Sequence, residues 1–195
     1  MRARQTGRRA MPALAATLLL AVAACASPNP DIYTLAAMPG PAVKIHAHSI
    51  ELRRVGLAGY LDRPEIVRSD AQFRLQISGN ERWGEPMGGM IDRVFTEDLV
   101  ERLPNASVFA ESGAISTRPD VVLEVDVQRF DPDAGGNVVL LAQVAIRHED
   151  TNAPAVASEV RLTTTPASKT TPDLVAAMSM ALGQLADQVA ERLGR

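Results

Sequence analysis

The chain has 195 residues, of which 46% are apolar and 22% are charged, and its formal net charge is −3. This length fits one domain with a targeting segment, and this composition is typical of a chain that packs a core, which excludes disorder throughout. Loss of the four arginines in residues 1–9 would leave 16 basic residues against 23 acidic ones, and a chain this acidic lacks the basic footprint of a nucleic-acid-binding protein.

Residues 1–24 have the features of a bacterial lipoprotein signal peptide. A basic segment precedes a run at 13–24 that is apolar apart from Thr17, and this run falls short of the roughly 20 residues that cross a bilayer. Small residues then lead into Cys25, the only cysteine. We expect cleavage between Ala24 and Cys25 and acylation of Cys25, since several acyl chains give stable anchoring. The alternative is an ordinary secretory cleavage site beside a chance cysteine.

The segment after the cleavage site predicts how the domain is held. The segment at 25–32 is short and contains two prolines. We therefore expect it to be a lipidated tether, followed by a domain at 33–195. Ala26 and Ser27 follow Cys25, so no aspartate stands next to the cysteine, and by analogy with lipoprotein sorting in Gram-negative cells this favours the periplasmic face of the outer membrane. A lipidated Cys25 leaves no thiol for a disulfide, a metal or a nucleophile.

Period-two alternation of apolar and polar residues predicts the strands of the domain, each with one buried face. In chain order these runs are 43–48, 73–78, 121–128, 138–147 and 156–162. A breaker-rich stretch at 56–64 is expected to be a loop, and 131–137 is expected to be the turn of an antiparallel hairpin. The last three runs then make a meander.

Two stretches have the three- and four-residue apolar spacing of amphipathic helices. The first runs from Pro86 to Leu103, with Asp92 and Asp98 largely on its outer side, and the second follows a cap and first turn at 171–173. Together the strands and helices predict an α/β fold, a single domain with a mixed, mostly antiparallel sheet and two amphipathic helices.

Four short motifs along the chain resemble those of one family. They are Tyr-Thr-Leu at 33–35, Tyr-Leu-Asp-Arg-Pro-Glu-Ile-Val-Arg at 60–68, Trp-Gly-Glu-Pro-Met at 83–87 and Arg-Phe at 129–130. In order and spacing they are similar to the PqiC-type ABC-transport auxiliary lipoproteins, which serve MCE systems and membrane integrity. Gly84 and Met87 stand where the family's usual pattern has alanine and leucine, and both changes are mild.

The resemblance implies a domain of the anticodon-binding or TolB N-terminal type and a non-enzymatic role. It implies an accessory subunit of an intermembrane lipid transport system, with an MCE-domain protein and its ABC permease and ATPase as partners. Some members assemble into rings, so the resemblance allows a homo-oligomer. ATP hydrolysis would belong to another subunit, and no cofactor is expected.

Two of the motifs supply candidate partner-binding residues, because aromatic and arginine side chains dominate many protein interfaces. The candidates are Tyr60, Leu61, Asp62, Arg63, Pro64, Trp83, Glu85 and Pro86. For the loop at 60–64, packing on its own domain is an equal alternative. For the three residues at 83–86, fixing the entry to the first helix is the favoured alternative.

Neither a catalytic nor a metal site is expected. The sequence has no Gly-x-Ser-x-Gly elbow, phosphate loop or dinucleotide motif. His46 and His48 share a strand face without a visible third ligand, and Glu124 and Asp126 lie on the polar face of a strand, as solvated charges do. Two alternatives to a transport adaptor remain: an outer-membrane assembly lipoprotein that binds a β-barrel partner, and a lipid-modified hydrolase, for which no nucleophile is visible.

Overall fold

The computed structural model describes residues 29–69, 74–115, 117–149 and 154–195. The chain divides into two units, Met1–Pro30 and Asp31–Arg195. The expected cleavage site at Ala24 and Cys25 lies outside the described residues. The elements in chain order are β1 (Asp31–Tyr33), β2 (Ser49–Leu52), β3 (Gly56–Leu57), β4 (Glu65–Ser69), β5 (Leu75–Trp83), α2 (Met87–Arg102), β6 (Ser107–Ala110), β7 (Val121–Pro132), β8 (Val138–His148), β9 (Val156–Thr164) and α3 (Thr171–Leu193).

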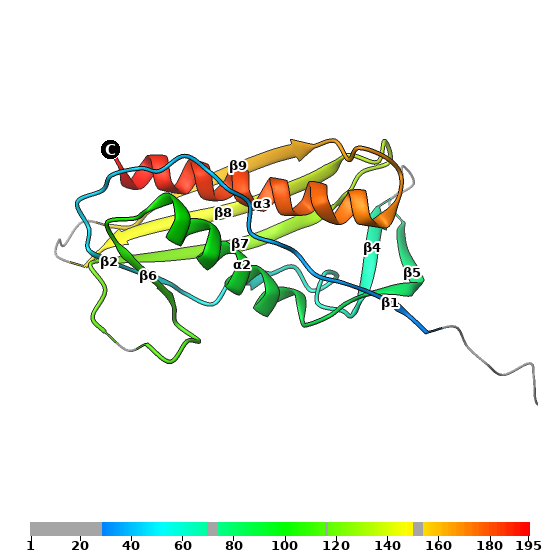
Figure 1. Ribbon diagram of the computed structural model, residues 1–195, viewed down its shortest axis with the longest axis horizontal. Helices are drawn as coiled ribbons and strands as arrows, with labels where there is room; N and C mark the ends of the chain where they lie inside the picture. Colours follow the sequence, from blue (N-terminus) through cyan, green and yellow to red (C-terminus); the bar gives the residue numbers. More distant parts are fainter. Residues whose placement is uncertain (1–28, 70–73, 116, 150–153) are drawn as a thin grey trace, which may run out of the picture. The chain divides into compact units, whose positions relative to one another are not determined.

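The larger sheet has six strands, with the order β6-β2-β7-β8-β9 and with β3 also paired to β7. β2 is parallel to both β6 and β7, and β3 is parallel to β7. β7, β8 and β9 form the predicted antiparallel meander, which is confirmed. Figure 1 shows both helices along one face of this sheet. Within the described part of the chain, neither helix is long and apolar enough to cross a membrane.

The turn between β7 and β8 is shorter than predicted. Pairing of Asp131 with Val139 continues the strand through Asp131, whose side chain is buried, so the prediction that Asp131 opens the turn is wrong. The turn itself is held by Asp133 Oδ1, which accepts the backbone N–H groups of residues 135 and 137 at 2.9 and 3.0 Å. Gly136 has a φ of 87°, a left-handed conformation that glycine adopts without steric cost.

A separate three-stranded sheet has the order β1-β5-β4, with β1 parallel and β4 antiparallel to β5. Figure 1 shows β4 and β5 beside the N-terminal end of α3. The predicted class, one mixed α/β domain with two helices, is confirmed. The strands form two mixed sheets, whereas one sheet was predicted, and neither sheet is closed. The longest pairings, β7–β8 and β8–β9, are antiparallel.

Both helices begin close to the predicted positions. Pro86 stands directly before α2, where a missing N–H leaves no helical hydrogen bond unmade. The Thr170 side chain caps α3 by accepting the Asp173 N–H at 3.4 Å, so the cap lies one residue before the predicted start. Each helix buries its apolar face in the shared core.

The predicted strand over 43–48 does not form, although burial there does alternate. Ile45 is buried and His46 is exposed, as the pattern predicts. The backbone of this segment bonds to the end of α2 and the residues after it: Val43 N–H donates to Arg102 O at 2.7 Å, and Asn105 Nδ2 donates to Ile45 O at 2.7 Å. The alternation at 43–48 therefore predicts correctly which side chains are buried. It does not predict the backbone pairing, because the first strand of this part of the chain is β2.

Asp92 and Asp98 are buried, contrary to the prediction that they lie on the outer side of α2. Asp92 Oδ1 accepts the Val55 N–H at 2.8 Å, and Asp98 Oδ1 accepts the Met38 N–H at 2.7 Å. Irregular segments cover this side of the helix, and the two carboxylates satisfy their backbone donors. Burial raises the pKa of Asp98 to about 6.

Arg102, at the end of α2, joins both helices to the segment before β2. Its side chain is 1% exposed, and its Nε donates to Asp187 Oδ1 of α3 at 2.6 Å. Its Nη1 donates to Met38 O at 2.9 Å and its Nη2 donates to Gly183 O at 3.1 Å. A buried guanidinium needs such a complete set of acceptors, because its charge has lost its water.

Candidate partner-binding surface

The loop at 60–64 is fixed to the domain by its first two side chains. The Tyr60 hydroxyl donates to Asp131 Oδ1 of β7 at 2.9 Å, and Leu61 lies within the core. Burial and the Asp131 charge raise the pKa of Tyr60, so the phenol stays protonated as a donor. These two side chains pack inside the domain.

The remainder of the loop is more open. Arg63 N–H donates to Leu61 O at 2.9 Å, which closes a tight turn. Asp62 and Pro64 are exposed, and Arg63 is half-buried. Residues 62–64 are therefore the part of this motif that a partner can reach.

Asp131 is a buried carboxylate that joins three segments. Its side chain is 0% exposed, and it accepts hydrogen bonds from Tyr60, from Arg129 Nε at 3.0 Å and from the Ser69 hydroxyl of β4. A buried charge is costly unless it is paired and hydrogen-bonded. All three donors therefore stabilise the Asp131 carboxylate, and loss of one would weaken the contacts of the other two. Asp131 thus fastens the loop and β4 to the edge of the larger sheet.

The turn at 83–86 lies next to the loop. Trp83 is buried in the core, and its N–H donates to Pro64 O at 2.7 Å, which brings the two candidate motifs together. Glu85 Oε1 pairs with Arg93 Nη2 of α2 at 2.6 Å. Pro86 is exposed and directly precedes α2. Trp83 and Glu85 therefore position the entry to α2, and Pro86 is open to solvent.

The first motif, at 33–35, meets the same turn. Gly84 N–H donates to Tyr33 O at 2.8 Å, and Arg93 Nη2 donates to Thr34 Oγ1 at 3.3 Å. Leu35 is 1% exposed in the core. With Arg129 bonded to Asp131, all four motifs of the family resemblance are joined in a chain of contacts around the three-stranded sheet.

An ionic cluster ties this sheet to the start of α3. Arg68 Nη2 donates to Thr171 Oγ1 at 2.8 Å and lies 3.6 Å from Glu81 Oε2, while Thr171 also donates to Glu81. Burial opposes ionisation of Glu81, but the hydrogen bonds from Thr171 and Ser78 and the charge of Arg68 together lower its pKa. The sheet therefore meets α3 through polar side chains.

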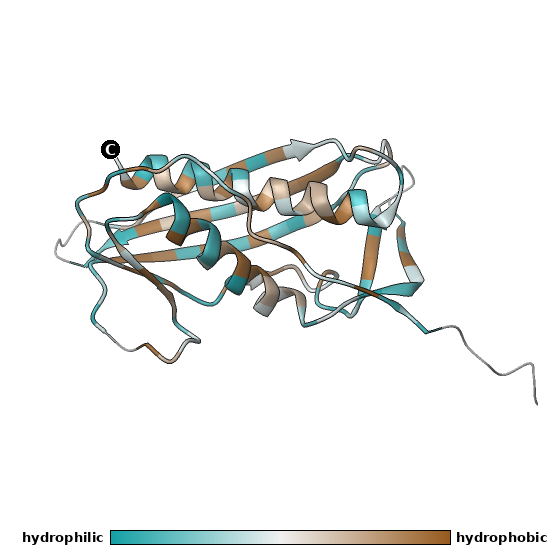
Figure 2. Ribbon diagram, viewed as in Figure 1, coloured by the Kyte–Doolittle hydropathy of each residue, from teal (hydrophilic) through white to brown (hydrophobic). Residues whose placement is uncertain are grey.

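The three-stranded sheet also exposes apolar side chains to solvent. Leu75 and Ile77 are 44% and 49% exposed, and Ile32 on β1 is 60% exposed. Figure 2 shows hydrophobic residues along β4 and β5. We call Ile32, Leu75 and Ile77 the small-sheet surface.

This exposure contradicts the predicted buried face of the run at 73–78, of which Phe73 lies outside the described residues. Leu75, Gln76 and Ile77 are all exposed, so this end of β5 buries neither of its faces in the core. Leu75 pairs with Ser69 and Ile77 pairs with Val67, so the two apolar side chains share one face of the sheet. The strand is present as predicted, but its apolar side chains are open to solvent.

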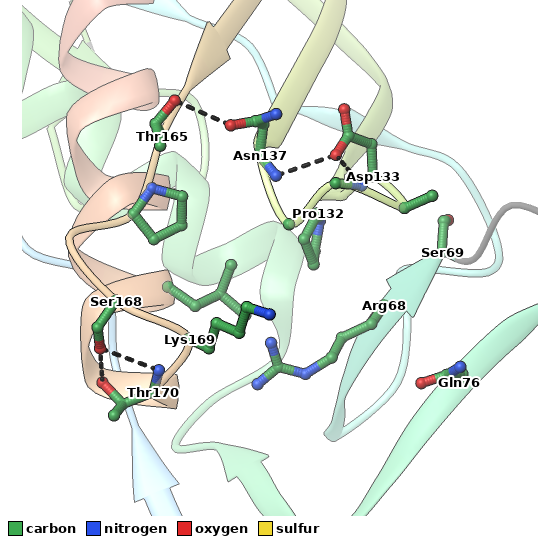
Figure 3. Close-up of a pocket in the computed structure, with 15 residues that line it drawn as sticks. Arg68, Ser69, Gln76, Pro132, Asp133, Asn137, Thr165, Ser168, Lys169 and Thr170 are labelled. Atoms are coloured by element: carbon green, nitrogen blue, oxygen red, sulfur yellow. Dashed lines mark hydrogen bonds between the residues drawn. The ribbon is translucent and has the colours of Figure 1, made fainter.

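A surface cavity of about 480 Å³ adjoins β4 and β5 and is lined there by Arg68, Ser69 and Gln76. Figure 3 shows Arg68 and Lys169 at this cavity, with the β7–β8 turn and the segment before α3 forming its other walls. Thr165 Oγ1 donates to Asn137 Oδ1 at 2.8 Å across these two walls. A hollow with two basic side chains and several hydroxyls suits an acidic side chain better than an apolar one.

The other sequence candidates lie elsewhere. His46 and His48 are exposed, and the described ranges contain no group of three His, Cys, Asp or Glu side chains that could hold a metal ion. Glu124 pairs with Arg53 at 3.2 Å on the open face of the larger sheet, and Asp126 is exposed there. These acids are solvated charges on a sheet face.

The sequence matches the family model described as the ABC-type transport auxiliary lipoprotein component over residues 33–190. The chain belongs to this family. Membership implies a lipid-anchored location in the cell envelope and association with an ABC-type transport system, and the family is an auxiliary component with no known enzymatic activity. No curated protein sequence matches the chain.

Solved structures share the fold at low sequence identity. An uncharacterized protein has a TM-score of 0.71 and 16% identity, over 85% of this chain and 99% of its own. Protein XCC0632 from Xanthomonas campestris has a TM-score of 0.67 and 19% identity, over 84% of this chain and 93% of its own. The PelC dodecamer from Paraburkholderia phytofirmans is more distant, with a TM-score of 0.46 and 12% identity over 78% and 95%.

Two residues that organise the family motifs were missed from the sequence. Asp131 was assigned to a turn, although Arg129 two residues earlier on the same strand face gave a signal for an ion pair. Glu81 carried no sequence signal, because its partners Arg68 and Thr171 come from β4 and α3.

Proposed function

We propose that this protein is a membrane-anchored accessory subunit of an MCE-type intermembrane lipid transport system. It acts as a non-enzymatic adaptor: the acyl chains of Cys25 hold it at the periplasmic face of the outer membrane, and the domain at 33–195 binds or caps the MCE assembly. Residues 1–24 are removed as the signal peptide, and residues 25–32 form the tether, whose last two residues already pair with β5 as the start of β1. The permease and ATPase of the system supply the energy.

The observation that carries this proposal is the convergence of the four motifs on the three-stranded sheet. Polar contacts through the buried Asp131, the half-buried Glu81 and the exposed Arg93 hold this region in one arrangement, while Ile32, Leu75 and Ile77 stay open to solvent. Apolar side chains beside a rigid polar frame are typical of a surface that another protein covers. β1 also begins one residue after Pro30, so this surface is the first part of the domain after the tether.

Site-specific photocrosslinking in intact cells tests the proposal. A photoreactive residue at Ile77 or at Asp62 is expected to capture an MCE-domain protein. The matched control is Ile115, an apolar residue that is 58% exposed in the segment between β6 and β7 and is remote from the motifs in sequence. It is expected to capture no MCE-domain protein.

The outcomes separate the alternatives. Capture of a β-barrel protein from Ile77 would favour the outer-membrane assembly role, and equal capture of the MCE protein from Ile115 would remove the small-sheet surface from the proposal. Cys25→Ser is expected to release the protein from the membrane fraction and to abolish labelling by a fatty acid. Retention of that label in Cys25→Ser would contradict the anchor.

A further inference from the structure

The three histidines of the sequence lie together at the C-terminal end of α3. His46 and His48 precede β2 and His148 ends β8, yet all three line one surface cavity of about 400 Å³. Arg192 and Arg195 line the same cavity. Five side chains that carry or can gain positive charge therefore meet at one place, although they come from three distant parts of the chain.

An apolar hollow adjoins these basic side chains. It has a volume of about 220 Å³ and is lined by Ile146 and Val156, together with His148, Arg192 and Arg195. Val156 is 72% exposed at the start of β9. The Arg192 guanidinium donates to the Ser158 hydroxyl, which holds it at the border between the two hollows. Basic and apolar surfaces are thus continuous at this end of the domain.

One acid, Asp120, lines the cavity. Its Oδ2 accepts the backbone N–H groups of His48 and Ser49 at 2.7 and 3.1 Å. These bonds lower the pKa of Asp120 and engage one of its two carboxylate oxygens. Among the described residues, neither Arg192 nor Arg195 forms an ion pair with an acidic side chain. The carbonyl end of α3 favours their positive charge.

We propose that this end of the domain, the His/Arg end, binds the phosphate group of an anionic amphiphile, whose acyl chain lies along Ile146 and Val156. Arginine matches phosphate oxygens with two parallel donors, and a histidine ring donates from one nitrogen when neutral and from both when charged. An apolar strip beside a phosphate site accepts the first methylenes of a lipid tail.

The His/Arg end is remote from the point where the chain enters the domain. β1 pairs with β5, and Glu81 of β5 contacts Thr171 at the start of α3, whereas Arg192 lies at its other end. A helix of 23 residues is about 35 Å long. Figure 1 shows β1 and the C-terminus at opposite ends of α3. A lipid bound here is therefore separated from the tether-proximal surface by the length of α3.

The test measures capture of one membrane by protein anchored in another. The full chain, purified from bacterial membranes with its acyl chains, is inserted into phosphatidylcholine vesicles. These are mixed with labelled vesicles of phosphatidylcholine alone or with added phosphatidylglycerol, and co-flotation is measured. We expect capture of the phosphatidylglycerol vesicles only.

Variants locate the capture. Arg192→Gln with Arg195→Gln is expected to weaken it roughly thirtyfold, since each basic side chain near an anionic surface contributes about 1 kcal/mol. Replacing all three exposed histidines by Ala should also weaken capture, because it removes ring nitrogens that can donate to phosphate. Arg161→Gln, an exposed arginine in the middle of β9, is the control for charge and should leave capture unchanged.

Several results would overturn the inference. One is equal capture of both vesicle types, and another is equal weakening by Arg161→Gln, which would mean unspecific charge attraction. A third is release of the captured vesicles by inorganic phosphate at the same concentration as the phosphatidylglycerol. That result would indicate a site for the phosphate ion in which the acyl chain has no role. No MCE protein is present in the assay, so its failure and that of the proposed adaptor role are distinguishable.

Discussion

The two sheets of this protein place opposite kinds of side chain on their open faces. The larger sheet covers the core with residues such as Val125 and Val144, and its open face carries ion pairs such as Glu124 with Arg53. The three-stranded sheet meets the rest of the domain partly through polar clusters and exposes Leu75 and Ile77.

This difference separates a structural role from a binding role. An open sheet face covered by charges is stable in water and discourages association. Apolar side chains on an open face add no stability to the isolated protein. The polar contacts of the smaller sheet fix its position but leave these apolar side chains exposed. The larger sheet therefore builds the domain, while the smaller one carries the surface that we propose for a partner.

The largest expected effect concerns the core beside the larger sheet. Arg102→Leu leaves the acceptors Met38 O, Gly183 O and Asp187 without their donor and should lower the free energy of unfolding by about 3–5 kcal/mol. Urea denaturation followed by circular dichroism measures it. Arg161→Leu, at an exposed arginine, should change stability by no more than about 0.5 kcal/mol. If Arg102→Leu lowered the free energy of unfolding by no more than Arg161→Leu, the buried hydrogen bonds of Arg102 would contribute little to stability.

The node that holds the smaller sheet comes next. Asp131→Asn keeps the shape but removes the charge and one acceptor for Tyr60, Ser69 and Arg129, so we expect a loss of about 2 kcal/mol in the same measurement. Asp126→Asn is the control on the same strand, because Asp126 is exposed. Equal stability of the two variants would show that polar contacts do not hold the smaller sheet.

A pH dependence tests the interior beneath α2. The folded-state pKa of Asp98, about 6, lies above its ordinary value of 3.8, so its stabilising contribution is present below about pH 4 and is lost as the pH rises through 6. Between pH 4 and 7 the wild type should lose on the order of 2 kcal/mol relative to Asp98→Asn. Denaturation of both proteins across this range checks it, and parallel curves would contradict a buried carboxyl that resists ionisation.

The smallest expected effect on stability concerns the small-sheet surface. Ile77→Ser should change the free energy of unfolding by less than about 0.5 kcal/mol, because Ile77 is half exposed. It should nevertheless reduce copurification of the MCE partner. Val144→Ser on β8, at 1% exposure, should cost about 2–3 kcal/mol. If Ile77→Ser destabilises the domain as much, the contrast between the two sheets fails.

The longest elements could be predicted from the sequence because their signals are local. The meander at β7, β8 and β9 follows from alternation, and both helices follow from apolar spacing, from Pro86 and from the cap and first turn expected at 171–173. The short strands β1, β2, β3 and β6 were not predicted, and β3 lies in the stretch expected to be a loop. The candidate site was only partly predictable. Tyr60, Leu61 and Trp83 are among the predicted partner-binding residues, but their side chains lie largely inside the domain. Asp62, Pro64 and Pro86 are exposed, and their partner-binding role stays a prediction.

The sequence by itself determined the fold class, the family motifs and the expected anchor at Cys25, because these depend on residue type and short-range spacing. Only the tertiary structure decided that Leu75 and Ile77 of β5 are exposed, that Asp98 and Asp131 are buried, and that His148 lines the same cavity as His46. Each of these depends on contacts between residues far apart in the chain, such as Asp131 with Tyr60 and Asp98 with Met38. Local patterns cannot specify such contacts, because the covering segment is chosen by the packing of the whole domain.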